Sequence, residues 1–169
     1  MEAGAVRKKY ESITRMLIET GQTITAMESC TSGLIASLLT DTEGASTVMK
    51  GAFVTYSNEA KIRAGVPAEV IRRYGVYSEE TAVEMAGTCR KYWDADFGIG
   101  VTGTFGNADP ANGDSVPGSV YYAVAAESFM ICRSMNIPAL PSRHAYKLFA
   151  ADQLADALLE ALQRKQSGK

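Results

Sequence analysis

Apolar residues recur at the spacing of an α-helix in two long stretches of this 169-residue chain. The first stretch covers residues 6–20 and is followed by Gly21, a residue typical of helix C-termini. The second stretch covers residues 142–163, and its apolar stripe includes Leu148, Leu154, Leu158, Leu159 and Leu162. We therefore predict two amphipathic helices, each of which needs an apolar surface to cover.

Between these helices, short apolar runs rich in β-forming residues alternate with further helical stretches. We expect strands at residues 24–29, 48–56, 97–102, 119–126 and 129–137. We expect helices at residues 31–41, 58–64, 68–74 and 78–93, the second of them capped by Asn58. This alternation predicts one domain over residues 1–169, an α/β fold arranged as a three-layer α/β/α sandwich. The last two strands are adjacent and form a hairpin, so the sheet is expected to be mixed and mostly parallel.

Composition and charge argue against several classes of protein. The net charge is −2, and the 17 basic residues are spread along the chain without forming the basic face of a nucleic-acid binder. No apolar run approaches the roughly 20 residues of a membrane span. The segment 1–9 is polar and basic, with no apolar core after it, unlike a secretory signal. We therefore expect a cytoplasmic protein that binds neither nucleic acid nor membrane.

The cysteines and the histidine also limit the possible chemistry. Cys30, Cys89 and Cys132 are far apart in sequence and do not suggest a disulfide framework. His144 is the sole histidine, so a zinc site is not expected. A Ser-His-Asp triad would need His144 as its base, yet its neighbours look helical and exposed. We therefore expect neither a metal nor an organic cofactor.

Ligands of α/β sheets collect at the carboxyl ends of strands, and three such corners carry polar residues. The first corner consists of Glu28, Ser29, Cys30, Thr31, Ser32 and Gly33. A helix that begins there could bind an anion such as a phosphate at its N-terminus, or the hydroxyl side chains could simply cap it. Cys30 could be a nucleophile, but no histidine lies near it in sequence to activate it.

The second corner combines Ser46 with Tyr56 and Lys61. A serine hydroxyl needs a base at neutral pH, and a lysine with a lowered pKa can take that role. Lys61 lies one turn into its predicted helix and could point back over the end of the strand. A solvated surface lysine is the alternative, and the sequence does not place Ser46 relative to Lys61.

The third corner is the end of the strand at Thr102 and Gly103, where the loop 103–118 begins. Glycines there permit close approach of the backbone to a ligand and leave N–H groups as donors for an oxyanion. The alternative is an ordinary loop with turn residues. A loop of this length within a compact domain is often functional.

These corners together resemble the CinA C-terminal domain family. The most specific strings are Glu28-Ser29-Cys30-Thr31-Ser32-Gly33 and Tyr56-Ser57-Asn58-Glu59-Ala60-Lys61. Gly44-Ala45-Ser46, Val101-Thr102-Gly103 and Pro117-Gly118 occur in the same order as in that family, and the resemblance runs from about Val6 to Leu162. The family includes stand-alone nicotinamide mononucleotide deamidases, often called PncC.

The resemblance implies a metal-free amidohydrolase that converts nicotinamide mononucleotide to nicotinic acid mononucleotide and ammonia, in pyridine nucleotide salvage. It implies Ser46 as nucleophile and Lys61 as its base, with Tyr56 beside them. It also implies that the corner from Glu28 to Gly33 helps to form the pocket, together with Thr102 and Gly103, and that Arg143 meets the phosphate. A homo-oligomer is expected on the same ground.

The sequence departs from the family's pattern at the pocket. Ser32 stands where a second glycine is usual, and Phe105 and Asn107 replace a small residue and a proline. Lys147 stands where an arginine is typical, and the two differ at a phosphate site. Two alternatives therefore stay open: an amidase of the same fold that acts on another amide, and a non-catalytic nucleotide-binding or competence-related module.

Overall fold

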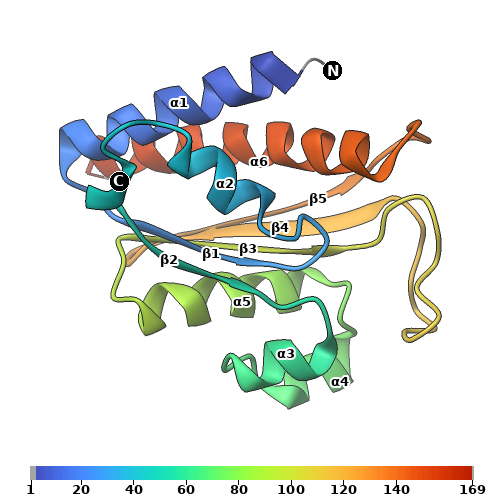
Figure 1. Ribbon diagram of the computed structural model, residues 1–169. Helices are drawn as coiled ribbons and strands as arrows, with labels where there is room; N and C mark the ends of the chain where they lie inside the picture. The colour runs from blue at the N-terminus through green and yellow to red at the C-terminus, as the bar shows by residue number, and fades with distance from the viewer. Residues whose placement is uncertain (1–2, 169) are drawn as a thin grey trace.

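The computed structural model describes residues 3–168, and these form a five-stranded sheet between two layers of helices (Figure 1). The strands are β1 (Ile24–Glu28), β2 (Met49–Val54), β3 (Phe97–Gly103), β4 (Ser119–Ala125) and β5 (Met130–Asn136). The α-helices are α1 (Ala3–Thr20), α2 (Leu34–Thr40), α3 (Asn58–Arg63), α4 (Ala68–Tyr74), α5 (Glu79–Tyr92) and α6 (Arg143–Gln166), and a 3₁₀ turn, η1 (Ala45–Thr47), precedes β2. The predicted three-layer α/β/α fold is confirmed.

The strands follow the order β2-β1-β3-β4-β5 across the sheet. β1 pairs in parallel with both β2 and β3, whereas β4 pairs antiparallel with β3 and with β5. Four of the five strands therefore run in one direction, and β4 alone runs the other way. The expected mixed, mostly parallel sheet and its terminal hairpin are confirmed.

The two long amphipathic helices cover the same face of the sheet. α1, α2 and α6 lie on this face, and α5 lies on the other, with α3 and α4 beside it (Figure 1). Tyr10 of α1 is fully buried, and its hydroxyl donates to the backbone oxygen of Ala151 in α6 at 2.9 Å. The apolar stripes read from the sequence therefore pack against the sheet and against each other, as amphipathic helices require.

α5 lies unusually close to the central strand β3. A Cβ atom at Gly98 or Gly100 would overlap the backbone oxygen atoms of Ala86 and Ala82 in that helix. The two glycines therefore make room for the helix backbone, which explains why they interrupt an otherwise apolar strand.

Two local predictions need correction. The second strand ends at Val54, before the predicted limit at residue 56. Asn58 is the first residue of α3 and does not cap it, because the Ser57 hydroxyl accepts the hydrogen bond from the Ala60 N–H. Both Ser57 and Asn58 are good capping residues, so the sequence alone did not choose between them.

The carboxyl ends of β1, β2 and β3 lie at one edge of the sheet, next to α3 and the long loop 104–118 (Figure 1). The Asn58 side chain donates to Asn112 Oδ1 at 2.7 Å, which ties this loop to α3. Among residues 3–168, no helix has the length and apolar character needed to cross a membrane.

Candidate active site

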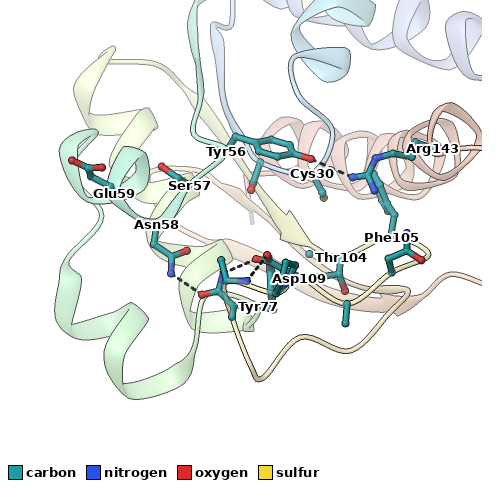
Figure 2. Close-up of a pocket in the computed structure, with 17 residues that line it drawn as sticks. Cys30, Tyr56, Ser57, Asn58, Glu59, Tyr77, Thr104, Phe105, Asp109 and Arg143 are labelled. Atoms are coloured by element: carbon teal, nitrogen blue, oxygen red, sulfur yellow. Dashed lines mark hydrogen bonds between the residues drawn. The ribbon is translucent and has the colours of Figure 1, made fainter.

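A pocket of about 570 Å³ opens where the carboxyl ends of β1 and β3 meet the long loop (Figure 2). Its walls are formed by Ser29 and Cys30 after β1, residues 56–59 after β2, Tyr77 before α5, most of residues 103–112 after β3, and Arg143 at the start of α6. A volume of this size suits a small-molecule ligand. The pocket lies at the edge of the sheet where α/β folds usually bind ligands.

Lys61 lies directly behind this pocket and contacts Ser29 in its wall. The side chain is 1% exposed, and Nζ donates to Ser29 Oγ at 3.0 Å and to the backbone oxygen of Thr55 at 2.9 Å. Ser29 Oγ donates to no acceptor among residues 3–168. The serine hydroxyl is therefore held by the lysine, with its own proton uncommitted.

Burial lowers the pKa of Lys61 from 10.5 to about 8, because the interior solvates an ammonium group poorly. None of the ion pairs within residues 3–168 includes Lys61. Its nearest partners are thus a hydroxyl and a carbonyl oxygen, which do not fix its charge. A substantial fraction of Lys61 is therefore neutral in mildly alkaline solution, as a general base requires.

The topology explains why Lys61 and Ser29 meet. β1 and β2 are parallel neighbours, and the Thr55 N–H donates to the Glu28 oxygen, so Ser29 and Thr55 leave the sheet side by side. Lys61 lies in the first turns of α3, and helical side chains lean toward the N-terminus of their helix. The lysine therefore leans back toward the strand ends and reaches Ser29.

Ser46 lies at the opposite end of β2, and the predicted pairing of Ser46 with Lys61 is wrong. Ser46 is exposed in η1, before Met49, and Met49 pairs with Ile24 at the amino end of β1. Ser29 lies five residues beyond Ile24, or about 16 Å at the rise of a strand. Strand direction was the available signal, since Ser29 and Lys61 each follow a parallel strand whereas Ser46 precedes one.

The helix N-terminus after β1 does not offer its N–H groups to a ligand. The buried Glu28 carboxylate accepts hydrogen bonds from the backbone N–H groups of Gly33, Ile35 and Ala36 at 2.8–3.1 Å. An internal anion therefore occupies the position that a phosphate would take. The interpretation of this corner as a phosphate site is wrong, because the side chain of Glu28, in β1, already accepts from these N–H groups of α2.

Several other predicted pocket residues have places outside the pocket. Thr31 is buried and its hydroxyl has no hydrogen-bond partner within residues 3–168, while Ser32 is exposed with a positive φ of 52°. Gly33 is the N-cap of α2 and does not line the pocket. Thr102 is fully buried and donates to the Val76 backbone oxygen. These four residues do not line the pocket.

Cys30 and Gly103 line the pocket. Burial raises the pKa of the Cys30 thiol to about 12, so the thiolate that nucleophilic attack requires is scarce at neutral pH. A Cβ at Gly103 would lie 2.5 Å from the Ser119 backbone oxygen, so the strand needs glycine there. The nucleophile is therefore better sought at Ser29 than at Cys30.

Tyr56 and Arg143 meet at the rim of the pocket (Figure 2). Arg143 Nη2 donates to Tyr56 Oη at 3.2 Å, and the guanidinium lies 5.6 Å from the centre of the Phe105 ring. Phe105 is 1% exposed and stacks on Tyr146, with ring centres 5.4 Å apart. The Phe105 ring therefore packs against the guanidinium of Arg143, a contact that the sequence did not suggest.

The loop beyond Phe105 contributes an acidic side chain that sequence analysis missed. Asp109 accepts hydrogen bonds from Tyr77 Oη at 2.5 Å, from Asn112 Nδ2 at 2.6 Å and from the Ala111 N–H at 3.0 Å. These bonds, that from Tyr77 first, hold the pKa of Asp109 below its usual value. The sequence of the loop is typical of turns, and no sequence pattern linked Asp109 to the distant Tyr77.

His144 is exposed on α6 and does not line the pocket. Within residues 3–168, no three histidine, cysteine or acidic side chains gather in a way that could hold a metal ion.

The fold and the pocket define a three-layer α/β protein with a buried serine–lysine pair at the carboxyl edge of its sheet. The family model that matches is the CinA C-terminal domain, over residues 6–162, and the chain belongs to this family. The matched range agrees with the resemblance read from the sequence.

Relatives and solved structures agree with this assignment. The chain is 42% identical over 130 residues to a "CinA-like protein" of Chlorobium chlorochromatii, covering 74% of this chain and 30% of the relative. It is 35% identical over 132 residues to a "CinA-like protein" of Fervidobacterium nodosum, covering 78% and 32%. The chain thus spans about a third of the length of the curated relatives it matches.

A crystal structure of about this length is similar throughout. The competence/damage inducible protein CihA from Agrobacterium tumefaciens superposes with a TM-score of 0.85 at 29% identity, covering 96% of this chain and 98% of that chain. Its name refers to competence and damage induction, and those of the two relatives state only a likeness to CinA. These names do not state a reaction.

Proposed function

We propose that this protein is an amidohydrolase that converts nicotinamide mononucleotide to nicotinic acid mononucleotide and ammonia, with Ser29 as nucleophile and Lys61 as base. The observation that carries the proposal is the 3.0 Å contact of Lys61 Nζ with Ser29 Oγ in the pocket wall. A serine next to a partly neutral, buried lysine is an activated nucleophile. Membership of the CinA C-terminal domain family supports the choice of substrate.

In the first step, neutral Lys61 accepts the Ser29 proton while Ser29 Oγ bonds to the carbon of the carboxamide. A neutral amine keeps one N–H for the Thr55 oxygen and turns its lone pair to the Ser29 hydroxyl. The resulting ammonium then donates its proton to the leaving nitrogen, and the C–N bond breaks. Ammonia departs, and the acyl group stays on Ser29 as an ester.

In the second step, Lys61 accepts a proton from water, and the hydroxide oxygen attacks the ester carbon. The C–O bond to Ser29 breaks, the serine regains its proton from Lys61, and the carboxylic acid product leaves and gives its proton to the solvent as it becomes the carboxylate. The net reaction consumes one water for each ammonia released, and it requires the same base twice.

Backbone N–H groups next to the nucleophile would stabilise the oxyanion of each step. The Thr104 N–H already donates to the Ser119 oxygen, so it is not available. The N–H groups of Cys30 and Thr31 donate to no oxygen atom within residues 3–168, and they follow Ser29 directly. Loss of one oxyanion donor typically costs on the order of 100-fold in rate.

Arg143 is the proposed partner of the substrate phosphate. It is a pocket cation on the same wall as Tyr56, and its planar group matches phosphate oxygens. The N–H groups at the start of α2 donate to Glu28 and are not available to a phosphate. We therefore assign phosphate binding to the side chain of Arg143.

The test is ammonia release from nicotinamide mononucleotide by the unmodified protein, by Ser29→Ala and by Ser46→Ala, each with and without a chelator. We expect Ser29→Ala to lose at least about a thousandfold in kcat, as enzymes do when the nucleophile is removed. Ser46→Ala is the matched control and should keep its activity, since Ser46 lies at the far end of the sheet.

Near-normal turnover by Ser29→Ala would refute the role of Ser29, and loss of turnover in Ser46→Ala alone would restore the sequence-based assignment. If the folded wild type releases no ammonia from this nucleotide but does so from another amide, the proposed substrate is refuted and the proposed amidohydrolase reaction is supported. Tight nucleotide binding without turnover of any amide would instead favour a binding protein.

A further inference from the structure

Two charged side chains of the pocket lack an opposite charge of their own. Arg143 contacts the Tyr56 hydroxyl and the Phe105 ring, and Asp109 accepts only from neutral donors. Neither takes part in an ion pair within the described chain, residues 3–168. In a pocket, such uncompensated charges attract ligand groups of the opposite sign.

The two charges lie on different sides of the pocket. Figure 2 shows Arg143 with Tyr56 along one side, and Asp109 with Tyr77 along the other. They come from distant parts of the chain, α6 and the loop after β3. The pocket is therefore bipolar, with a fixed cation and a fixed anion facing the same ligand space.

Asp109 is held as an anion in a fixed orientation. Hydrogen bonds from Tyr77 and Asn112 lower its pKa, and burial together with the bond to Asp109 raises the pKa of Tyr77. The tyrosine therefore stays a donor and the aspartate stays ionised at neutral pH. Asn58 anchors Asn112 in turn, so the carboxylate is attached to α3 through a chain of hydrogen bonds.

Asp109 lines the same pocket as Ser29, the residue that Lys61 contacts. Its negative charge raises the pKa of Lys61, against the larger effect of burial, and the lysine lowers the pKa of Asp109 in return. A charge that acts on Lys61 also acts on a group attached to the carbon that Ser29 attacks. The anion is thus placed to favour positive charge beside the reacting amide.

We propose that Asp109 determines specificity by selecting substrates whose carboxamide is carried on a positively charged ring, while Arg143 takes their anionic end. This inference rests on the proposed function and deepens it. Nicotinamide mononucleotide has this pattern, because its pyridinium ring is cationic and its phosphate is anionic. Its reduced, dihydropyridine form carries the same carboxamide and phosphate on an uncharged ring.

The experiment compares kcat/KM for ammonia release from the oxidised and the reduced mononucleotide, in wild type and in Asp109→Asn. Each substrate differs in intrinsic reactivity, so the quantity of interest is the oxidised-to-reduced ratio. We expect Asp109→Asn to lower this ratio on the order of tenfold, because one charge–charge attraction is lost. Any general disturbance of the loop affects both substrates and cancels in the ratio.

Two further variants sharpen the result. Asp109→Glu keeps the charge and should restore most of the preference for the oxidised form. Asp114→Asn removes a carboxylate of the same loop that does not line the pocket, and it should leave the ratio unchanged. An unchanged ratio in Asp109→Asn, or an equal fall in Asp114→Asn, would overturn the inference.

Failure of the proposed function can be told apart from failure of this inference. If wild type hydrolyses neither nucleotide, the proposed function fails, and calorimetric binding of both nucleotides to wild type and Asp109→Asn replaces kcat/KM. A preference of wild type for the oxidised form that Asp109→Asn reduces would support the role of Asp109 even then. Equal affinities in wild type, or no binding of either nucleotide, would overturn it.

Discussion

Replacing Lys61 by methionine tests the feature on which the proposed chemistry rests. Methionine has a similar length and no charge, so Lys61→Met keeps most of the packing and removes the buried titrating group. In the native protein burial lowers the pKa of this lysine from 10.5 to about 8. The folded protein therefore loses the proton at a lower pH than the unfolded chain does.

The sign and size of the effect on stability follow from this difference. Below pH 8 the lysine is protonated in both states, and the cost of burying the charge is present in full. Between pH 8 and 10.5 the unfolded chain binds more protons, so the free energy of unfolding rises with pH. The rise is about 1.4 kcal/mol for each pH unit, or about 3 kcal/mol over the whole window.

The assay is urea unfolding of wild type and Lys61→Met at several pH values from 6.5 to 10.5. We expect the difference in unfolding free energy, wild type minus variant, to be flat below pH 8 and to rise by about 3 kcal/mol above it. Other titrating groups are common to both proteins and largely cancel. Lys50→Met is the matched control, because Lys50 is exposed on β2, and its difference should stay flat.

A flat difference for Lys61→Met across the window would refute the reasoning. It would mean that Lys61 does not lose its proton more readily in the folded protein, and the argument for a neutral lysine base would fail with it.

Two more predictions follow from the same contacts. The value of kcat/KM should fall about tenfold per pH unit below about pH 8, because only neutral Lys61 accepts the serine proton; a rate independent of pH between 6 and 8 would contradict this. Glu28→Gln should lower the free energy of unfolding by about 1–3 kcal/mol. Both oxygens of the Glu28 carboxylate accept hydrogen bonds from backbone N–H groups, whereas a glutamine side chain has a single oxygen acceptor. Urea unfolding measures the second effect, and unchanged stability would show that the second carboxylate oxygen of Glu28 is not needed by α2.

The fold was predictable because each element carries its own periodic pattern. The stripes of α1 and α6 and the short β-rich runs gave the layers, and the adjacency of β4 and β5 gave the hairpin. The errors lay at element ends, where Ser57 and Asn58 offer nearly equivalent caps. A local choice between two capping residues depends on tertiary contacts that periodicity does not contain.

The candidate site was harder to predict, because it depends on side-chain direction and on distant contacts. The structure brings Arg143 to Tyr56 at the pocket and Lys61 to Ser29, whereas the sequence analysis paired Lys61 with Ser46. Strand direction in a parallel sheet could have decided between the serines. The contact between Tyr77 and Asp109 joins residues 32 positions apart through an irregular loop, and no sequence pattern encodes it.

The role of Glu28 connects the fold to the charge pattern of the site. By accepting from the first N–H groups of α2, its carboxylate cancels the positive end of the helix next to Ser29. A free helix terminus there would stabilise any anion, including a substrate phosphate bound at the wrong end of the pocket. With that terminus occupied, the fixed charges facing the ligand are mainly Arg143 and Asp109, and these define opposite ends. The internal carboxylate of Glu28 therefore leaves side chains, and not the backbone, to orient the substrate.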